Sequence, residues 1–479
     1  MNASRSKTQA QFKANRLDAY NLVHEGIQAL GRASKNGIAV DLEYCKQMHD
    51  TLEDRMNHLT GKFFDSKMGR HWKSKYRTPN YNADGQVADI LFNEYKLPPL
   101  KLTPAGGYSV DNETLNFLSE DVPELNLLNK LRKYKKVKDT YLKGFIKETV
   151  DGFIHATPNL HTVTTYRSSY SDPNFQNVPK RDPVQKRMCR RAIKPRKGHQ
   201  IVAADYGGIE VKIANCYHLD PVMTEYNSSD EADMHGDMAG ALFCMNKTLS
   251  KSDGPGEKTL RNGAKNGFVF PQFYGDYYKN NANALTKWAG LPTGGKFDKN
   301  AGILLNSGQT IGEHLVKSGI KTFDDFVQHV KQEEDDFWNR RFKVYQEWKK
   351  AWLRKYQRQG YIDMLTGFRC SGIIEDNSVI NYPIQGTAFH CLLKSFIEID
   401  KWLVENNFNS LLIGQIHDEM VFDMDPAERD DVLGMVQYIT CEWLPREWPW
   451  IIVPMEIEAS IHPVDGSWAD EAEEIKLAA

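Results

Sequence analysis

Two apolar, strand-like segments that each carry an aspartate lie more than 200 positions apart in this sequence. IVAAD ends in Asp205. In SLLIGQIHDEMVFDM, the part QIHDEMVFDM alternates as a β-hairpin does, with Asp418 inside it. The segments that precede and follow these two strand-like segments have apolar residues at helical spacing. We therefore predict a mixed α and β fold with a small sheet in the C-terminal half, in which both carboxylates stand at strand ends.

These two carboxylates are candidate ligands of divalent cations. Two metal ions set ~3.5–4 Å apart can clamp the attacking and leaving oxygens of a phosphoryl transfer. Magnesium is usually held by a few carboxylates together with substrate phosphates. Two distant aspartates are weak evidence alone, because a buried or helix-capping aspartate has the same appearance in a sequence.

The segment RNGAKNGFVFPQFYG (261–275) lies between the two aspartates. Arg261 and Lys265 are four residues apart and share one helix face, where two cations suit a triphosphate. The aromatic residues that follow can stack on a base; they are Phe268, Phe270, Phe273 and Tyr274. A basic and aromatic amphipathic helix packed on a core is the simpler alternative.

Length and composition exclude several classes of protein. With 479 residues, 41% hydrophobic and 11% aromatic, the chain can form about three domains with sizeable cores, so it is not disordered throughout. No apolar run approaches the ~18 residues of a membrane span. Seven cysteines without a CxxC pair argue against a disulfide framework or a cysteine-based zinc site, and favour a reducing, cytoplasmic compartment.

Charge is balanced overall but not locally. The formal net charge is −2, yet the runs 131–143, 180–197 and 343–358 each hold at least six basic residues and one acid. A single run of this kind is most simply a solvated helix face. Three runs in a near-neutral chain favour a polyanionic partner such as nucleic acid.

The remaining pattern predicts the following elements. Helices are expected from 17 to about 65, interrupted at Gly37 and restarted with Asp41 as N-cap, and again over 112–148 and 325–358, the last as one long helix. Residues 66–110 read as loop-rich, and 276–322 as a polar insertion. Further strands are expected at INYP (380–383) and WIIVPMEIEASI (450–461).

Several motifs, in this order, resemble those of family A DNA polymerases, the DNA polymerase I type, over roughly residues 20–470. TYRSSYSDPNFQNVP, VAADYGGIEVK, RNGAKNGFVFPQFYG, INYPIQGTA and QIHDEMVF each have a counterpart in the family, the second, third and fifth in its motifs A, B and C. The resemblance implies an α+β fold of the right-hand type: a palm with a small antiparallel sheet, and helical fingers and thumb. It also implies a template-directed DNA polymerase that extends a primer 3′-OH with dNTPs and releases pyrophosphate.

The resemblance divides the chain into a basic lead-in (1–20), a thumb with the N-terminal part of the palm (21–180), palm with motif A (181–230), fingers with an insertion at about 276–322 (231–375), and palm with motif C and the C-terminus (376–479). It implies two Mg²⁺ ions, replaceable by Mn²⁺, held by Asp205, Asp418 and the Tyr206 carbonyl, with Glu419 in support and Lys265 as a further catalytic group. It implies that the dNTP contacts Arg261, Lys265, Phe270, Tyr274, Glu210 and His235, with Glu210 excluding a 2′-OH. The residues implied to contact template or primer are Arg167, Asn174, Gln176, Asn177, Asn381, Gln385 and His417.

The sequence departs from the family pattern in motif B. Lys265 and Tyr274 are nine positions apart, and the family has eight. If the helix is anchored at its C-terminal end, Phe270 faces the sugar and a π-bulge near Gly267 absorbs the extra residue; if it is anchored at Lys265, Val269 faces the sugar. We expect Phe270. Gly207 and Gly208 replace a frequent Ser-Gln pair in motif A, and Asn377 stands where the family usually has arginine.

Further expectations concern what surrounds the polymerase. We expect no intrinsic 3′–5′ exonuclease, because such a domain would need on the order of 150 residues upstream. Primer-template DNA and dNTPs are the expected partners, with separate exonuclease or processivity proteins as further candidates and no membrane. The short N-terminal region favours a bacteriophage enzyme acting in the host cytoplasm. Two alternatives stay open: a single-subunit RNA polymerase-like enzyme and an inactive DNA-binding relative.

Overall fold

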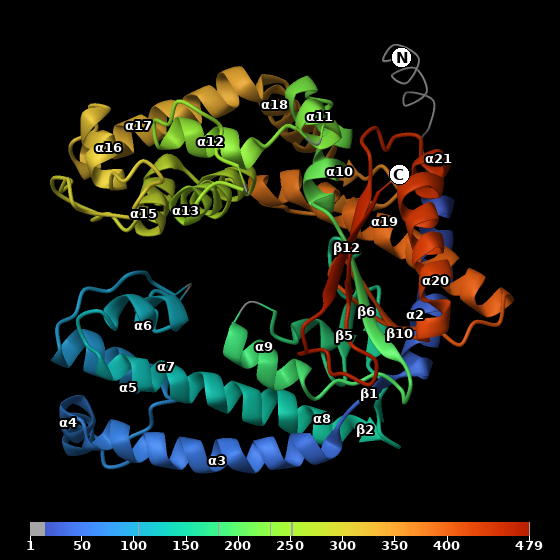
Figure 1. The fold of residues 1–479 in the computed structure, drawn as a ribbon, viewed down its shortest axis with the longest axis horizontal. Helices are drawn as coiled ribbons and strands as arrows, with labels where there is room; N and C mark the ends of the chain where they lie inside the picture. Colours follow the sequence, from blue (N-terminus) through green and yellow to red (C-terminus); the bar gives the residue numbers. More distant parts are fainter. Residues whose placement is uncertain (1–14, 104, 181, 230, 251, 479) are drawn as a thin grey trace.

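The computed structural model describes residues 15–103, 105–180, 182–229, 231–250 and 252–478, so most of the expected basic lead-in lies outside the described residues. Figure 1 shows an arch: one helical arm above, a second below, and a sheet at the right that joins them. We call residues 42–148 the lower arm and residues 221–359 the upper arm. In the described parts of the chain, no helix has the length and apolarity to cross a membrane.

The sheet that joins the arms has five strands in the order β12-β11-β6-β10-β9, and each neighbouring pair is antiparallel. Its centre is β6 (Gln200–Tyr206), which is buried along nearly its whole length between β10 (Glu419–Met424) and β11 (Glu456–Ile461). The outer strands are β9 (Leu411–Ile416) and β12 (Glu473–Ala478). The two sequence segments that carry aspartates thus pair directly, as predicted.

Helix α19 (Asp376–Glu405) packs with the sheet in one hydrophobic core, together with α2 (Arg16–Asn36) and α10 (Ile209–His218). Short pieces complete this body of the molecule. They are β4 (Thr157–Asn159), β5 (Ser169–Ser171), η3 (Phe175–Asn177), α9 (Pro183–Arg190), β7 (Tyr361–Asp363), β8 (Arg369–Ser371), η6 (Pro426–Glu428), α20 (Arg429–Gln437), η7 (Tyr438–Trp443) and α21 (Leu444–Glu447).

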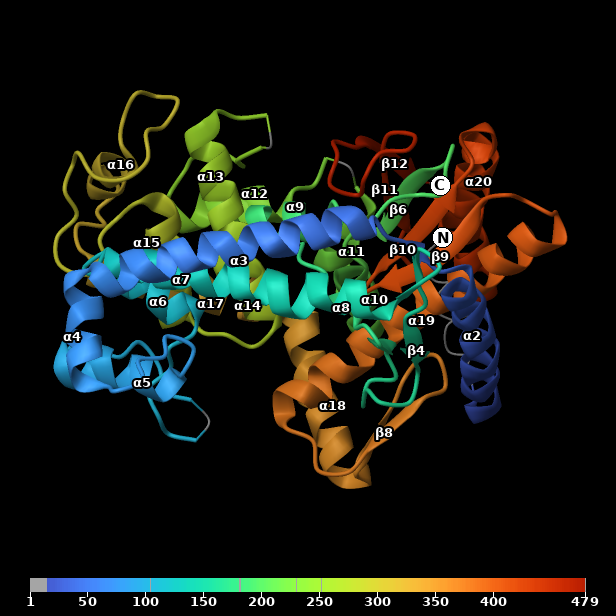
Figure 2. The same cartoon turned by 90° about the horizontal axis from the view of Figure 1, so that it is seen from below.

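The lower arm is built on α3 (Leu42–Asp65), which runs along its length (Figure 2). Asp41 caps α3 through the Tyr44 N–H, and the chain turns at Gly37, both as the sequence predicts. The other elements of this arm and its junction are β1 (Ile38–Ala39), α4 (Lys67–Lys75), α5 (Asp84–Ala88), η1 (Asp89–Glu94), α6 (Asn112–Leu118), α7 (Glu124–Lys135), η2 (Lys136–Leu142), α8 (Lys143–Glu148), β2 (Thr149–Val150) and β3 (Phe153–Ile154).

The upper arm has its own hydrophobic core. Its elements are α11 (Pro221–Ser228), α12 (Met234–Leu242), α13 (Pro255–Ala264), η4 (Lys265–Val269), α14 (Phe270–Phe273), α15 (Tyr278–Ala289), α16 (Ile311–Lys317), α17 (Phe323–Asp336), η5 (Phe337–Arg341) and α18 (Lys343–Gln359). The tips of the arms approach each other, since Lys287 of α15 lies 5.5 Å from the centre of the Phe117 ring of α6.

Two secondary-structure predictions were wrong, and two were incomplete. INYP is part of α19 and not a strand, because this helix is buried on most sides and its apolar run hides the helical period. Residues 325–358 form two helices separated by the π-helical η5, whose aromatic residues pack in the core of the upper arm. Residues 66–110 include the helices α4 and α5 between their loops, and the polar segment 276–322 begins with α15, one face of which is buried.

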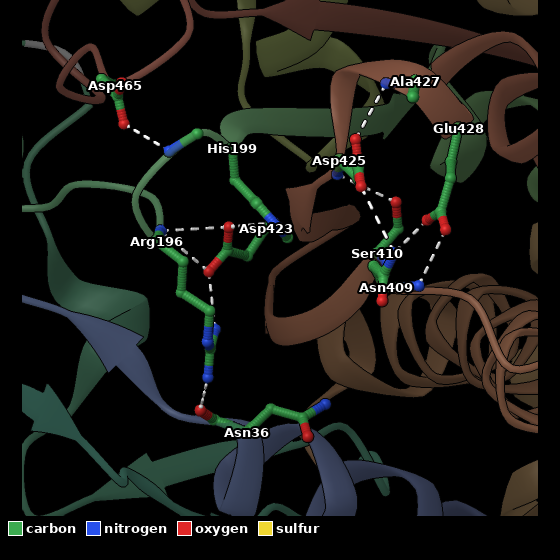
Figure 3. A network of polar contacts seen from close by, with 11 residues as sticks. Asn36, Arg196, His199, Asn409, Ser410, Asp423, Asp425, Ala427, Glu428 and Asp465 are labelled. Atoms are coloured by element: carbon green, nitrogen blue, oxygen red, sulfur yellow. Dashed lines mark hydrogen bonds and ion pairs between the residues drawn. The ribbon is translucent and has the colours of Figure 1, made fainter.

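A network of polar contacts fixes the end of β10 that lies away from Asp418 (Figure 3). Asp423, which is 1% exposed, accepts hydrogen bonds from the Arg196 backbone N–H and guanidinium. The same guanidinium donates to the backbone carbonyl of Asn36 at the end of α2. Because a buried carboxylate is costly unless it is paired, this contact ties α2 and the loop before β6 to the sheet.

Candidate active site

Two carboxylates from distant parts of the chain meet at one end of β6 and β10. Asp205 pairs in register with Glu419 across the two strands, and Asp418 lies in the turn just before β10. The Tyr206 N–H donates to the Asp418 carbonyl oxygen at 3.2 Å, which holds this turn against β6. The strand pairing therefore places three acidic side chains at the same end of these two inner strands.

Cation binding fits the chemistry of this edge. Oδ1 of Asp205 and Oε1 of Glu419 are buried and have no hydrogen-bond partner. Burial and the neighbouring Asp205 carboxylate raise the pKa of Asp418 to about 7. In the described residues, no group of three or more His, Cys, Asp and Glu side chains is arranged to hold a metal ion by itself. An ion here would draw its remaining ligands from substrate or water, which is how Mg²⁺ is commonly bound.

Two adjoining cavities open beside Asp418. A cavity of about 300 Å³ is lined by Glu210, Phe270, Tyr274, Asn381, Gln385 and Asp418, among others. A larger cavity of about 1030 Å³ is lined by Arg167, Gln176, Asn177, Gln385, His417 and Asp418, among others. Most of the residues expected to contact nucleotide or DNA thus line these two cavities, which share Glu210, Gln385 and Asp418.

Glu210 is held between residues from two other segments. The Tyr274 hydroxyl donates to Oε2 of Glu210 at 2.5 Å, and Nη1 of Arg167 lies 3.7 Å from its Oε1. Burial and the Glu210 carboxylate both raise the pKa of Tyr274, so its hydroxyl stays protonated as a donor. These contacts give the Glu210 carboxylate a defined position on the wall of both cavities.

The backbone of the motif B segment follows the register expected from its C-terminal end. Residues Lys265–Val269 form a π-helical turn, so the expected bulge near Gly267 is confirmed. Val269 is fully buried in the core of the upper arm, whereas Phe270 lines the smaller cavity. A π-helical turn accommodates one extra residue without moving the flanking helix faces, which explains the longer spacing.

The two cations expected to bind a triphosphate are not equally available. Arg261 is 7% exposed, and its Nε and Nη2 donate to the two carboxylate oxygens of Asp233 at 2.6 and 2.8 Å. Nζ of Lys265 lies 5.3 Å from the centre of the Phe270 ring, against which His235 also packs edge-on. Lys265 therefore stands near the smaller cavity, while Arg261 would first have to leave Asp233.

The segment 165–179 contributes residues of two kinds. Gln176 donates to Ser168 and Gln415, so it stabilises the wall of the larger cavity through a hydrogen-bond network. Asn177 lines the larger cavity directly. Asn174 is exposed and is not among the residues that line either cavity.

Sequence reasoning missed Lys180 and Arg190 and assigned them only to a basic run. Nζ of Lys180 lies 3.0 Å from Oδ2 of Asp205 and 3.1 Å from Oε2 of Glu419. Arg190 is 5% exposed and stacks on Trp468, with 4.0 Å between guanidinium and ring centre. Only the strand pairing, which a local pattern does not reveal, brings these acids to Lys180.

Several basic residues of the three basic runs are paired or buried within the fold. In the first, Lys133 pairs with Asp182 and Lys138 with Glu53, and in the second, Lys194 pairs with Asp41. In the third, Lys349 lies 3.3 Å from the centre of the Trp338 ring, and burial lowers its pKa to about 7. The runs therefore carry less free positive charge than their composition indicates, and the first run is the most fully paired.

Comparison with solved structures first identifies the class of fold. The structure is similar to the POL domain of Pol1 from M. smegmatis in complex with DNA primer-template and dNTP, with a TM-score of 0.68 and 22% sequence identity over 93% of this chain and 70% of that one. The right-hand polymerase fold, of the α+β class, is thus confirmed.

The sequence comparisons then give the family. The family model described as DNA polymerase family A matches residues 42–286 and 329–465, so this chain belongs to DNA polymerase family A. DNA polymerase I of Lactococcus lactis subsp. lactis (strain IL1403) is 26% identical over 417 residues, which cover 86% of this chain and 42% of that protein. DNA polymerase I of Bacillus subtilis (strain 168) is 26% identical over 458 residues, which cover 92% and 44%. The chain spans less than half the length of these relatives.

Proposed function

We propose that the chain is a template-directed DNA polymerase that adds dNTPs to a primer 3′-OH and releases pyrophosphate. The observation that carries the proposal is the meeting of Asp205, Asp418 and Glu419 at one end of β6 and β10, beside the two cavities. The family match and the DNA polymerase I relatives support the same activity.

The carboxylates would hold the cations. Asp205 and Asp418 supply hard oxygen donors, the Tyr206 carbonyl adds a third, and the buried, unpartnered Oδ1 of Asp205 suits such a ligand. Two Mg²⁺ ions bound there, or Mn²⁺ in their place, supply the Lewis acidity that an in-line attack of the primer 3′-OH on the α-phosphorus needs. Glu419 supports the pair from the adjacent strand position.

The walls of the smaller cavity would select and orient the nucleotide. Lys265, with Arg261 once it is released from Asp233, attracts the triphosphate, and His235 lies beside them. Phe270 packs against the sugar, and Tyr274 lies by the templating base. The fixed carboxylate of Glu210 excludes a 2′-OH, which favours dNTPs over rNTPs.

The larger cavity would receive primer and template. The residues proposed to contact them are Arg167, Asn174, Gln176, Asn177, Asn381, Gln385 and His417. Arg167 contributes positive charge for the phosphate backbone, and the amides contribute donors and acceptors for base edges and sugars.

Primer extension tests the proposal. A labelled primer on a template is incubated with the four dNTPs or the four rNTPs, with Mg²⁺, with Mn²⁺ or with EDTA. We expect template-directed extension with dNTPs that requires a divalent cation, and little with rNTPs. Extension with rNTPs alone would favour an RNA polymerase-like enzyme, and binding without extension would favour an inactive relative. A primer with a mismatched 3′ end tests the further proposal that this chain does not shorten it.

A further inference from the structure

Lys180 places a positive charge where the carboxylates of the candidate site converge. Its Nζ bridges Oδ2 of Asp205 and Oε2 of Glu419 at 3.0 and 3.1 Å. The other oxygen of each carboxylate is buried and has no hydrogen-bond partner. The strand register brings the two carboxylates together. In the described structure, the Lys180 ammonium group contacts both and offsets their negative charge.

The carboxylates need such a charge. Glu419 is 4% exposed, and burial raises its pKa while Lys180 and Arg190 lower it. Arg190 is held by its stacking on Trp468. Two neighbouring carboxylates without a cation repel each other in a site of low dielectric, so the ammonium group of Lys180 stabilises their present arrangement.

The base of the Lys180 side chain is held by the fold, and its tip is partly exposed. The chain before it is anchored by Phe175, which is buried and stacks on Trp468, and the chain after it by Asp182, which caps α9 and pairs with Lys133. The Lys180 side chain itself is 52% exposed. It lies on the wall of the larger cavity and also of a separate cavity of about 440 Å³ behind the carboxylates, so its ammonium group has space to move away from them.

We propose that Lys180 is a positioning residue that holds Asp205 and Glu419 together in the absence of metal and is displaced when a divalent cation binds there. Lys180 and the cation compete for the negative charge of the Asp205 carboxylate, which Lys180 contacts at Oδ2. The inference rests on the proposed function, because that function requires a divalent cation at Asp205. Because the ion pairs of Lys180 must break first, this side chain weakens the affinity of the site for the cation.

Cation binding to the protein alone tests this competition. We compare the wild type with Lys180→Met, which keeps the length of the side chain without its charge, and with Lys180→Arg. Lys186→Met is the control, since Lys186 is exposed and lines the same rear cavity. Mn²⁺ affinity is measured by electron paramagnetic resonance without DNA or nucleotide. We expect Lys180→Met to bind Mn²⁺ about five- to tenfold more tightly, as loss of a partly exposed ion pair allows. Affinities equal to or weaker than wild type would overturn the proposal.

Thermal unfolding gives a second readout. In EDTA, Lys180→Met should unfold at a lower temperature than the wild type, and saturating Mn²⁺ should remove most of the difference. Lys180→Arg and Lys186→Met should resemble the wild type in both conditions. A lower melting temperature that Mn²⁺ leaves unchanged would indicate a purely structural lysine.

Labelling of the wild type requires no variant to fold. Acetylation of lysines by a small reagent, followed by mass spectrometry, is compared with and without Mg²⁺. Labelling of Lys180 should rise severalfold with Mg²⁺, and that of Lys186 should not change. Unchanged labelling of Lys180 would contradict the inference. Primer extension by the wild type in the same preparation distinguishes the proposed function from the role of Lys180. Extension with unchanged labelling would refute only the role of Lys180. Absence of extension would refute the proposed function.

Discussion

The Tyr274 hydroxyl donates a hydrogen bond to Oε2 of Glu210 at 2.5 Å, which joins the upper arm to the helix that follows the central strand. Arg167 approaches the other oxygen of the same carboxylate. Because both oxygens have neighbours, the Glu210 side chain has little freedom at the wall of the smaller cavity. A fixed carboxylate can discriminate between substrates that differ by one hydroxyl, whereas a mobile one would move aside.

Glu210→Ala should relax the choice of sugar. Removal of the carboxylate makes room for a 2′-OH, so we expect the ratio of rNTP to dNTP incorporation to rise about 10- to 100-fold. Single-nucleotide incorporation kinetics with matched rNTP and dNTP measure this ratio. Tyr274→Phe is the comparison, since it removes the hydrogen bond but keeps the carboxylate and should shift the ratio less. An unchanged ratio in Glu210→Ala would show that another group excludes the hydroxyl.

Asp205→Asn and Asp418→Asn should each abolish extension. Each amide replaces an anionic oxygen donor, and we expect the rate to fall by about a thousandfold or more, while primer-template affinity stays within a few-fold. Single-turnover extension and fluorescence anisotropy with labelled DNA measure the two quantities. Glu458→Gln is the matched control, because Glu458 lies opposite Asp205 on the other neighbouring strand. Activity within tenfold of the wild type in either aspartate variant would refute the assignment.

Phe270→Tyr should reduce discrimination against dideoxynucleotides. Phe270 lines the smaller cavity, so an added hydroxyl can replace the contact of the missing 3′-OH, which is worth about tenfold in the ddNTP/dNTP ratio. Val269→Tyr should not shift the ratio, because Val269 is fully buried and the larger side chain would destabilise the protein by about 1–3 kcal/mol. Incorporation ratios and melting temperatures of both variants are compared. A shift confined to Val269→Tyr would reverse the register.

Two buried histidines should make the protein sensitive to acid. Burial lowers the pKa of His218 and of His390 to about 3 each, from an ordinary value of 6.5. Below pH 6.5 the unfolded chain binds protons that the folded protein excludes, so each histidine lowers the free energy of unfolding by about 1.4 kcal/mol per pH unit until the pH nears 3.

Denaturant unfolding between pH 7 and pH 4 measures this slope. His218→Phe keeps an aromatic ring against Tyr345, on which His218 stacks at 4.0 Å, and should reduce the slope by one proton. Val404→Ala, which changes an exposed side chain that does not titrate, should leave the slope as in the wild type. An identical slope in wild type and His218→Phe would mean that this histidine titrates normally in the folded protein.

Local patterns predicted the parts of the fold that depend on local interactions. Asp41 as N-cap and the turn at Gly37 were correct because capping and backbone preferences act over a few residues. The π-helical turn at 265–269 was also predicted, because the segment is one residue longer than the family motif that it resembles and Gly267 can absorb the extra residue. The helix at 380–383 was missed, since a segment buried on most sides shows no period.

The candidate site also has features that the sequence indicates and features that depend on the fold. The candidates for the chemistry could be named before the fold was known, because Asp205, Glu210, Lys265 and Asp418 stand in motifs that resemble those of family A DNA polymerases. The contacts of the charged side chains could not be read from the sequence and became visible in the fold. Arg261 is engaged by Asp233, and Lys180 lies between Asp205 and Glu419. Such pairings depend on strand register and helix packing across long sequence separations, and a charge finds its partner only after those contacts have formed.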